Sequence, residues 1–321
     1  MNILCVSYWD NGGQLQLLSE AIRKYTKHDA LHLNIQATYL DYEKDLYYLD
    51  FKQSPMGILE LKEKLSSYDD FFIFSELLPE DAPLRDILEE LGIYRKLTSR
   101  NVIIRTCGSI PRNKAEHYLF AQLKKGYIYA GAAHDFSIAS QIGFVAPTRH
   151  ICPIDKIPKP NPPTNKIRVA FAPTKQEKGV NVFARVMEKL TAEFHEKDVV
   201  EAVPIINKPW RESIKIKSEC NVTFDQFMIS TYGNSAIESM YLSHAVLSRI
   251  DPYTQMLFPD LPVINVCTER DLYMQLKWLI ENPEELEERG KRGKEFVEKY
   301  HSPEVVAKQW EKLIEHILRE D

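Results

Sequence analysis

The motif YGNSAIESM, at residues 232–240, places a glycine, a helix start and one acidic side chain directly after an apolar run at 221–229. Backbone N–H groups at a helix N-terminus can face a diphosphate, and Glu238, one turn into the helix, can accept hydrogen bonds from a ribose. A second interpretation is local, because Ser235 and Glu238 fit the S-x-x-E capping box. The motif alone leaves both interpretations open.

The loop APTKQEKGVNVF, at residues 172–183, carries two lysines after an apolar run. Lys175 and Lys178 are placed to neutralise a diphosphate, with Thr174 as a polar neighbour in the same loop, and Gly179 lets the chain turn into a helix. Solvated lysines on a surface loop are the alternative. The pattern therefore indicates a possible phosphate site without requiring one.

A third loop, YWDNGG at residues 8–13, ends in paired glycines before a helix. Gly12 and Gly13 would let the backbone approach a ligand closely and would leave N–H groups exposed at the helix start. The loop lacks the G-x-G-x-x-G fingerprint, so a Rossmann dinucleotide site is unsupported. A tight turn alone is the other explanation for the two glycines.

Composition restricts the classes of protein that can carry these loops. The chain has 321 residues, 44% hydrophobic and 27% charged, which is typical of a soluble two-domain protein. A net charge of −5 gives no general reason to bind nucleic acid or an anionic membrane. Five scattered cysteines predict neither a disulfide framework nor a zinc site. No apolar run approaches the ~20 residues of a membrane span and no signal peptide is evident, so we expect a cytoplasmic location.

Short apolar runs alternate with amphipathic helical stretches, which predicts parallel sheets covered by helices, an α/β fold. The expected strands are 3–7, 71–74, 102–105, 167–172, 199–206, 245–248 and 263–266, and the clearest helices are 14–25 and 180–194. The proline-rich segment IPKPNPPTNK reads as a linker. We therefore expect an N-terminal domain at 1–160, a C-terminal domain at 161–301 and a closing helix at 302–321.

Three segments together resemble glycosyltransferases of the GT-B type, in particular the retaining, group 1 nucleotide-sugar enzymes. They are KIRVAFAPTKQEKGVNVF, STYGNSAIESMYLSHAVLSR and the tail NPEELEERGKRGKEFVEKYHSPEVVAKQWEKL. The resemblance covers nearly the whole chain. It implies two Rossmann-like domains facing across a cleft, with the last helix crossing back to the first domain. It also implies transfer of a sugar from a nucleoside diphosphate donor to a hydroxyl acceptor, with retention and without a metal.

The resemblance also implies roles for individual residues. Lys178 would contact the donor phosphates, Glu238 would hold the ribose, and Gly12 and Gly13 would approach the diphosphate from the first domain. The full set of expected donor contacts is Gly12, Gly13, Thr174, Lys175, Lys178, Gly233, Asn234, Ser235 and Glu238. The donor is a co-substrate with a base that the sequence does not fix, UDP being slightly favoured, and no further cofactor is expected. The acceptor could be a glycan, a lipid-linked molecule or a small molecule.

Three positions depart from the family pattern. Ala172 stands where many relatives carry an arginine, Ser230 where many carry a sugar-binding glutamate, and Cys107 where some carry a histidine. The catalytic residue is therefore unassigned, and the candidates are Ser109, Arg112 and His134. No D-x-D triplet or cluster with metal-ligand spacing is present in the sequence, so no metal is expected.

Two other functions stay open. Nucleotide-sugar epimerases share the architecture, but they need carboxylates and a histidine facing the donor sugar, and Ser230 and Cys107 remove two of the expected groups. A nucleotide-sugar-binding scaffold that has lost turnover would tolerate all three departures. Nucleotide binding without transfer or donor hydrolysis would favour the scaffold, and epimerised donor formed without acceptor would favour the epimerase.

Overall fold

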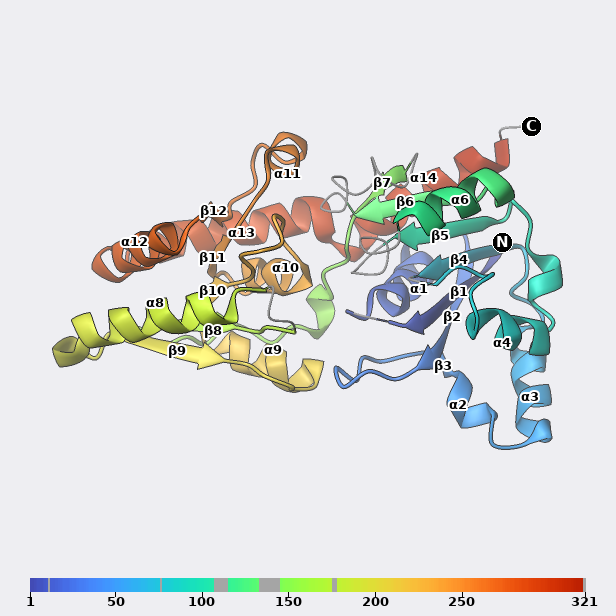
Figure 1. The fold of residues 1–321 in the computed structure, drawn as a ribbon, viewed down its shortest axis with the longest axis horizontal. Coiled ribbons are helices and arrows are strands. Elements are labelled where there is room, and N and C mark those ends of the chain that lie inside the picture. Colours follow the sequence, from blue (N-terminus) through green and yellow to red (C-terminus); the bar gives the residue numbers. More distant parts are fainter. Residues whose placement is uncertain (11, 76, 107–114, 133–144, 175–177, 320–321) are drawn as a thin grey trace. The chain divides into compact units, whose positions relative to one another are not determined.

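The computed structural model describes residues 1–10, 12–75, 77–106, 115–132, 145–174 and 178–319 (Figure 1). The chain divides into two compact units. Unit 1 comprises Met1–Ile151 and Pro303–Asp321, and unit 2 comprises Cys152–Ser302. The proline-rich segment, expected to be a linker, lies within unit 2, where the Asn161 N–H donates to the Ser218 carbonyl at 2.7 Å.

Unit 1 contains a parallel sheet with the strand order β3-β2-β1-β4-β5-β6-β7. Its strands are β1 (Asn2–Trp9), β2 (Asp29–Gln36), β3 (Leu46–Tyr47), β4 (Phe71–Ser75), β5 (Val102–Thr106), β6 (Ile128–Ala132) and β7 (Val145–Thr148). Alternate side chains of β1 enter different cores. Leu4 and Val6 join a cluster on one face, and Ile3 and Cys5 join a cluster on the other. Burial on both faces explains why a central strand such as β4 is a nearly continuous apolar run.

Helices cover both faces of the unit 1 sheet. They are α1 (Gln14–Tyr25), α2 (Tyr48–Phe51), α3 (Pro55–Leu65), α4 (Leu84–Glu90), α6 (Ala115–Lys125) and α14 (Pro303–Arg319). Helices α2, α3, α4 and α6 contribute to the cluster with Leu4, while α1 and α14 contribute to the cluster with Ile3.

Helix α14 completes unit 1 from the far end of the sequence. It packs along α1, and its Trp310 and Ile314 are fully buried in the same cluster as Leu18 and Ile22 of α1. The predicted return of the closing helix to the first domain is therefore confirmed. No described helix of the chain is both long and apolar enough to cross a membrane.

Unit 2 has a five-stranded parallel sheet with the order β12-β11-β10-β8-β9. Its strands are β8 (Ile167–Phe171), β9 (Val200–Pro204), β10 (Val222–Phe224), β11 (Ala245–Ser248) and β12 (Ile264–Asn265). Its helices are α8 (Val180–Glu193), α9 (Trp210–Ser218), α10 (Asn234–Tyr241), α11 (Pro252–Leu257), α12 (Glu269–Glu281) and α13 (Glu285–His301). The predicted α/β class with two parallel sheets is confirmed.

Two glycines let helix α13 lie close to α10 and to the turn that follows it. A Cβ added at Gly290 would lie 2.3 Å from the backbone oxygen of Ser243, whereas one at Gly293 would lie 3.2 Å from that of Met240. An alanine inside a helix is normally about 1 kcal/mol more favourable than a glycine. Close packing should reverse this preference at Gly290.

We expect Gly290→Ala to lower the free energy of unfolding by about 1–3 kcal/mol, because the added methyl group overpacks the contact with Ser243. Gly293→Ala, one turn further along the same helix, is the matched control and should cost much less. Urea titration of both variants followed by circular dichroism measures the difference. Equal stability of the two variants would contradict the close contact.

Candidate functional site

The order of strands in unit 2 identifies the edge where a ligand would bind. Strands β8 and β10 are neighbours in the sheet. After β8 the chain continues to β9 on one side of this pair, and after β10 it continues to β11 on the other side. Loops that follow two such strands diverge, and ligands of open α/β sheets bind at this switch point. The loop after β8 contains Lys178, and the loop after β10 leads to Gly233.

A buried carboxylate connects these two loops. Asp225, the residue after β10, accepts the N–H of Gly233 on Oδ2 at 2.9 Å, and its Oδ1 lies 3.6 Å from Nζ of Lys178. The Asp225 side chain is fully buried, while that of Lys178 is 15% exposed. Two predicted donor contacts are thus brought together by a third residue that the sequence analysis missed. An acidic residue directly after a buried strand was the available signal.

The surroundings of Lys178 suit an anion. Gly179 caps helix α8 in the left-handed region with φ of 93°, and Gly233 caps α10. The first N–H groups of a helix have no acceptor within it, so the start of α10 can face a negative group. Gly233, Asn234 and Ser235 are half-buried there, and Thr174 is exposed in the loop after β8. A lysine together with this helix start can bind phosphate oxygens.

Gly179 is required by both its conformation and its packing. Its positive φ disfavours a side chain, and an added Cβ would lie 2.7 Å from Cβ of Phe227. We expect Gly179→Ala to lower the free energy of unfolding by about 1–3 kcal/mol and to displace Lys178. The control is Gly92→Ala, where φ is 75° and nothing lies within 4 Å. Denaturant titration that gave equal losses for both variants would exclude a steric role of Phe227.

Glu238 lies in a buried ion pair. Its Oε2 accepts from Nζ of Lys217 at 2.7 Å and its Oε1 from Nε1 of Trp210 at 2.8 Å, both from α9. The side chains of Glu238 and Lys217 are only 8% and 3% exposed. Both carboxylate oxygens are thus engaged within unit 2. The ribose role of Glu238 stays a prediction, and a ribose hydroxyl would have to share or replace one of these donors.

The capping-box interpretation of the same motif is wrong. Helix α10 begins at Asn234 with Gly233 as its N-cap, and no side chain caps it. Ser235 therefore lies inside the first turn, and the Glu238 carboxylate is directed to Lys217 and Trp210. Instead, the carboxylate of Asp225, the residue after β10, accepts the N–H of Gly233.

In unit 1 the glycine loop is built around Asp10. The Asp10 carboxylate accepts the N–H groups of Leu15 and Gln16, each at 3.1 Å, so the start of α1 already holds a negative charge. Gly12 and Gly13 have φ of 96° and 65°, and a Cβ at Gly13 would lie 2.6 Å from the Tyr42 ring. Positive φ accounts for both glycines, and close packing against Tyr42 adds to it at Gly13. Their predicted contact with a diphosphate remains untested.

Two of the three departures from the family pattern lie in the described structure. Ala172 packs against the small apolar cluster that contains Val203 and Ile205, so its surroundings are apolar. Ser230 is half-buried, and its carbonyl accepts the N–H of Asp251 at 3.0 Å. The third departure, Cys107, lies outside the described part of the chain. So do four predicted site residues: Lys175, Ser109, Arg112 and His134.

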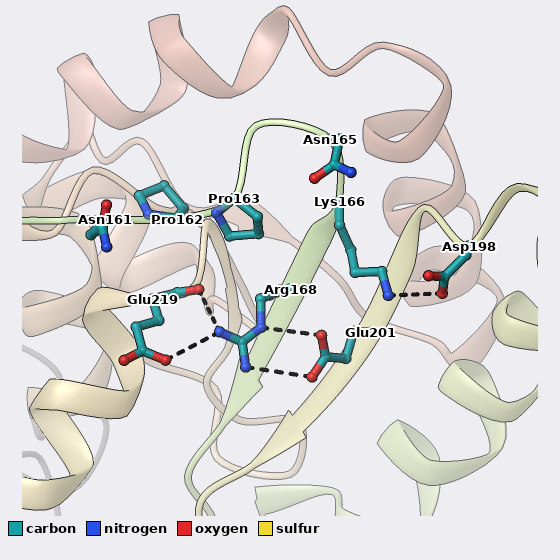
Figure 2. A pocket seen from close by; sticks show the side chains of 9 residues that line it. All are labelled: Asn161, Pro162, Pro163, Asn165, Lys166, Arg168, Asp198, Glu201 and Glu219. Atoms are coloured by element: carbon teal, nitrogen blue, oxygen red, sulfur yellow. Dashed lines mark hydrogen bonds and ion pairs between the residues drawn. The ribbon is translucent and has the colours of Figure 1, made fainter.

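A polar pocket in unit 2 lies at the opposite edge of the sheet (Figure 2). Its lining includes Asn165 and Asp198, which precede β8 and β9, so it is at the amino ends of the strands. Arg168 donates to both carboxylate oxygens of Glu201, at 3.2 and 3.4 Å, and to the carbonyl of Glu219 at 3.0 Å. Because its charges pair with one another, this pocket is a structural ion-pair network.

No protein-family model matches the chain, and no curated protein matches it. Several solved structures, however, are similar to this chain. A glycosyltransferase from Rickettsia africae ESF-5 is 13% identical with a TM-score of 0.66, covering 100% of this chain and 99% of its own. HepE from Anabaena, solved with UDP and glucose, is 10% identical with a TM-score of 0.63, covering 98% and 100%. A putative UDP-N-acetylglucosamine 2-epimerase from Listeria monocytogenes is 11% identical with a TM-score of 0.59, covering 100% and 97%.

These similarities extend over the whole chain and define its fold. The chain has the GT-B fold, with two Rossmann-like units and a C-terminal helix that returns to the first. Nucleotide-sugar glycosyltransferases and UDP-N-acetylglucosamine 2-epimerases share this fold. The predicted architecture is therefore confirmed at the level of the fold.

Proposed function

We propose that this protein is a glycosyltransferase that moves a sugar from a nucleoside diphosphate donor to a hydroxyl acceptor. The observation that carries the proposal is that Asp225 contacts both Lys178 and Gly233, the N-cap of α10, at the switch point of the unit 2 sheet. The GT-B fold supports it, since enzymes that use nucleotide sugars share that fold. A UDP-sugar is the donor we favour, because HepE was solved with UDP.

The proposed chemistry needs positive charge where the diphosphate leaves. Lys178 and the first N–H groups of α10 would stabilise the negative charge that develops on the phosphate oxygens. Asp225 holds the start of α10 and lies beside Lys178, so it would fix the geometry of both groups before the donor arrives. Positive charge from these groups would let the diphosphate leave without a metal ion. Retention is proposed from the sequence resemblance alone.

Nucleotide binding is the direct test. Isothermal titration of the full chain with UDP, GDP and ADP, and with their glucose conjugates, should give one nucleotide with a dissociation constant at or below about 1 mM. Thermal unfolding in the presence of the same compounds is an independent readout, since a ligand raises the midpoint by binding the folded state. Failure of every nucleotide to bind at millimolar concentration would overturn the proposal.

An epimerase is the second candidate, because the Listeria structure of that putative activity has a TM-score of 0.59 over the whole chain. The two activities differ in their need for an acceptor. An epimerase converts the donor sugar alone, whereas a transferase releases nucleoside diphosphate in step with acceptor glycosylation. Incubation of the protein with UDP-N-acetylglucosamine and no acceptor, followed by proton NMR of the sugar, would identify the epimerase by the appearance of a second sugar isomer.

A further inference from the structure

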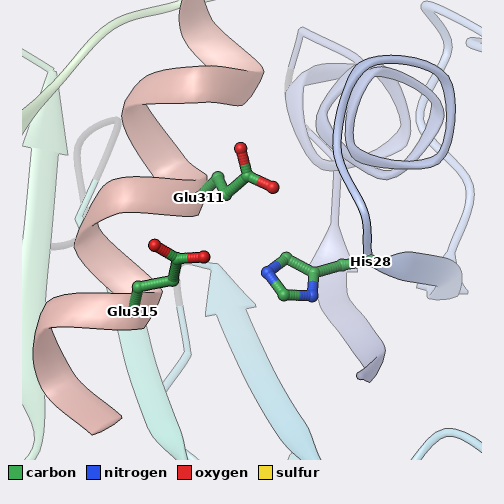
Figure 3. A group of neighbouring side chains, drawn as sticks. All are labelled: His28, Glu311 and Glu315. Atoms are coloured by element: carbon green, nitrogen blue, oxygen red, sulfur yellow. The ribbon is translucent and has the colours of Figure 1, made fainter. Parts of the chain in front are cut away.

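Three side chains from distant parts of the sequence meet at one edge of unit 1 (Figure 3). His28 lies in the turn between α1 and β2, and Glu311 and Glu315 lie one turn apart on α14. One ligand atom from each residue can be chosen so that all three atoms lie within 4.8 Å of one another. His28 directly precedes β2, so the group is at the amino ends of the strands, opposite the loop of Asp10.

His28 is a buried polar group whose hydrogen-bonding capacity is unused. The residue is 6% exposed, and neither Nδ1 nor Nε2 has a hydrogen-bond partner within the described structure. A buried polar group without a partner is costly and calls for an explanation. An imidazole nitrogen without a hydrogen-bond partner can bind a ligand through its lone pair. In Figure 3 the ring points toward the two carboxylates.

The two glutamates accept hydrogen bonds from nearby basic residues and retain acceptor capacity. Nζ of Lys308 donates to Oε2 of Glu311 at 2.9 Å, the backbone N–H of Lys27 donates to Oε1 of Glu311 at 3.2 Å, and Nζ of Lys27 pairs with Oε1 of Glu315. Each carboxylate oxygen has two lone pairs, so these bonds leave room for a further ligand. The side chains of Lys27, Lys308 and Arg319 around the carboxylates are 69%, 48% and 78% exposed. Exposed ion pairs of this kind are weak and are readily displaced.

We propose that His28, Glu311 and Glu315 bind a zinc ion. One imidazole and two carboxylates are ligands that zinc accepts, and three protein ligands leave a fourth tetrahedral position for water. Ligand atoms about 2.0–2.2 Å from a tetrahedral zinc lie roughly 3.4 Å apart, so ligand atoms that now lie within 4.8 Å of one another would have to close by up to about 1.4 Å. The ion would give one of the two unpartnered ring nitrogens of His28 a partner.

The ion would stabilise the fold of unit 1. The ion would fasten α14 to the turn before β2 and so tie the two segments of unit 1 together. It would be separate from the loops of Lys178 and Gly233, which belong to unit 2, and from Gly12 and Gly13, which follow the carboxyl end of β1 at the opposite edge of the unit 1 sheet. No local sequence motif predicts this site, because the histidine and the i, i+4 glutamates lie at opposite ends of the chain.

The test uses the full chain without a polyhistidine tag, stripped of metal by a chelator. After equilibration with ZnCl₂ and dialysis, we expect one zinc per chain by atomic absorption. At a zinc concentration about 100 times the dissociation constant, the unfolding midpoint should rise by about 5 °C. Glu315→Gln keeps the shape of the side chain but removes its charge, and it should abolish both effects. His195→Ala changes an exposed histidine of unit 2 and should leave both unchanged.

His28→Ala provides a second variant on the other element and should also lose zinc. Because it removes a buried ring, it could fail to fold, in which case the half-exposed Glu315 carries the comparison. No zinc retained by the unsubstituted chain would overturn the proposal. Equal zinc content and equal midpoint shifts in Glu315→Gln and the unsubstituted chain would also overturn it, since the ion would then be bound elsewhere.

Discussion

Replacing Lys178 with alanine should weaken nucleoside diphosphate binding by about 10- to 100-fold. A hydrogen bond to a charged group contributes about 1.5–3 kcal/mol, and each 1.4 kcal/mol is a tenfold change in affinity. The variant also leaves the fully buried Asp225 without its positive neighbour, beside the start of α10. Phosphate oxygens would then approach a net negative site. Both effects act against the diphosphate in the same direction.

Isothermal titration with the nucleotide that binds the unsubstituted protein measures this loss. Lys189→Ala is the matched control. Lys189 is an exposed lysine on α8, the same helix whose N-cap, Gly179, directly follows Lys178. Lys178→Arg keeps the charge and should recover part of the affinity. Affinities that were the same for Lys178→Ala and Lys189→Ala would remove Lys178 from the donor site and, with it, the observation that carries the proposed function.

Replacing Lys217 with methionine should lower the free energy of unfolding by about 3–5 kcal/mol at pH 7. Methionine fills nearly the same volume, but it leaves Oε2 of Glu238 buried without the ammonium group that now lies 2.7 Å away. Breaking a buried ion pair is costly because the remaining charge is uncompensated. Guanidinium titration followed by circular dichroism and by tryptophan fluorescence gives the loss.

A double variant separates the charge from the packing. Lys217→Met with Glu238→Gln removes both charges and keeps an amide oxygen for Nε1 of Trp210, so it should recover most of the lost stability. If the double variant were as unstable as Lys217→Met alone, the loss would come from packing. The folded double variant also tests the ribose role of Glu238: unchanged nucleotide affinity would assign Glu238 to the stability of unit 2.

The sequence predicts the fold well because its dominant signals are local. Apolar runs such as FFIF at 71–74 are buried on both faces of a parallel sheet, and the apolar stripe of the helix at 14–25 packs into the unit 1 core. The ends of elements are predicted less well. The apolar run at 221–229 yields only the strand Val222–Phe224, because Asp225 turns the chain toward α10 and bonds to Gly233.

The candidate site is predicted in part for the same reason. Lys178 and Gly233 stand out because loops and glycines have local signatures. The partners of Glu238 do not, since Trp210 and Lys217 lie on the preceding helix α9 and only tertiary packing brings them to its two oxygens. The pairing of Lys178 with Asp225 likewise depends on β8 and β10 being neighbours in the sheet, which the order of residues alone does not reveal.

The path of the chain through unit 1 has a consequence for its synthesis. Trp310 and Ile314 of α14 share a hydrophobic core with residues of α1. The ribosome makes them only after it has made all of unit 2. Domains commonly fold in the order in which they emerge, but here the first unit emerges with one face of its core uncovered. Leu18 and Ile22 on α1 would stay exposed to water until α14 arrives. The first unit therefore cannot complete this core until unit 2 has been made, so unit 2 can finish folding first.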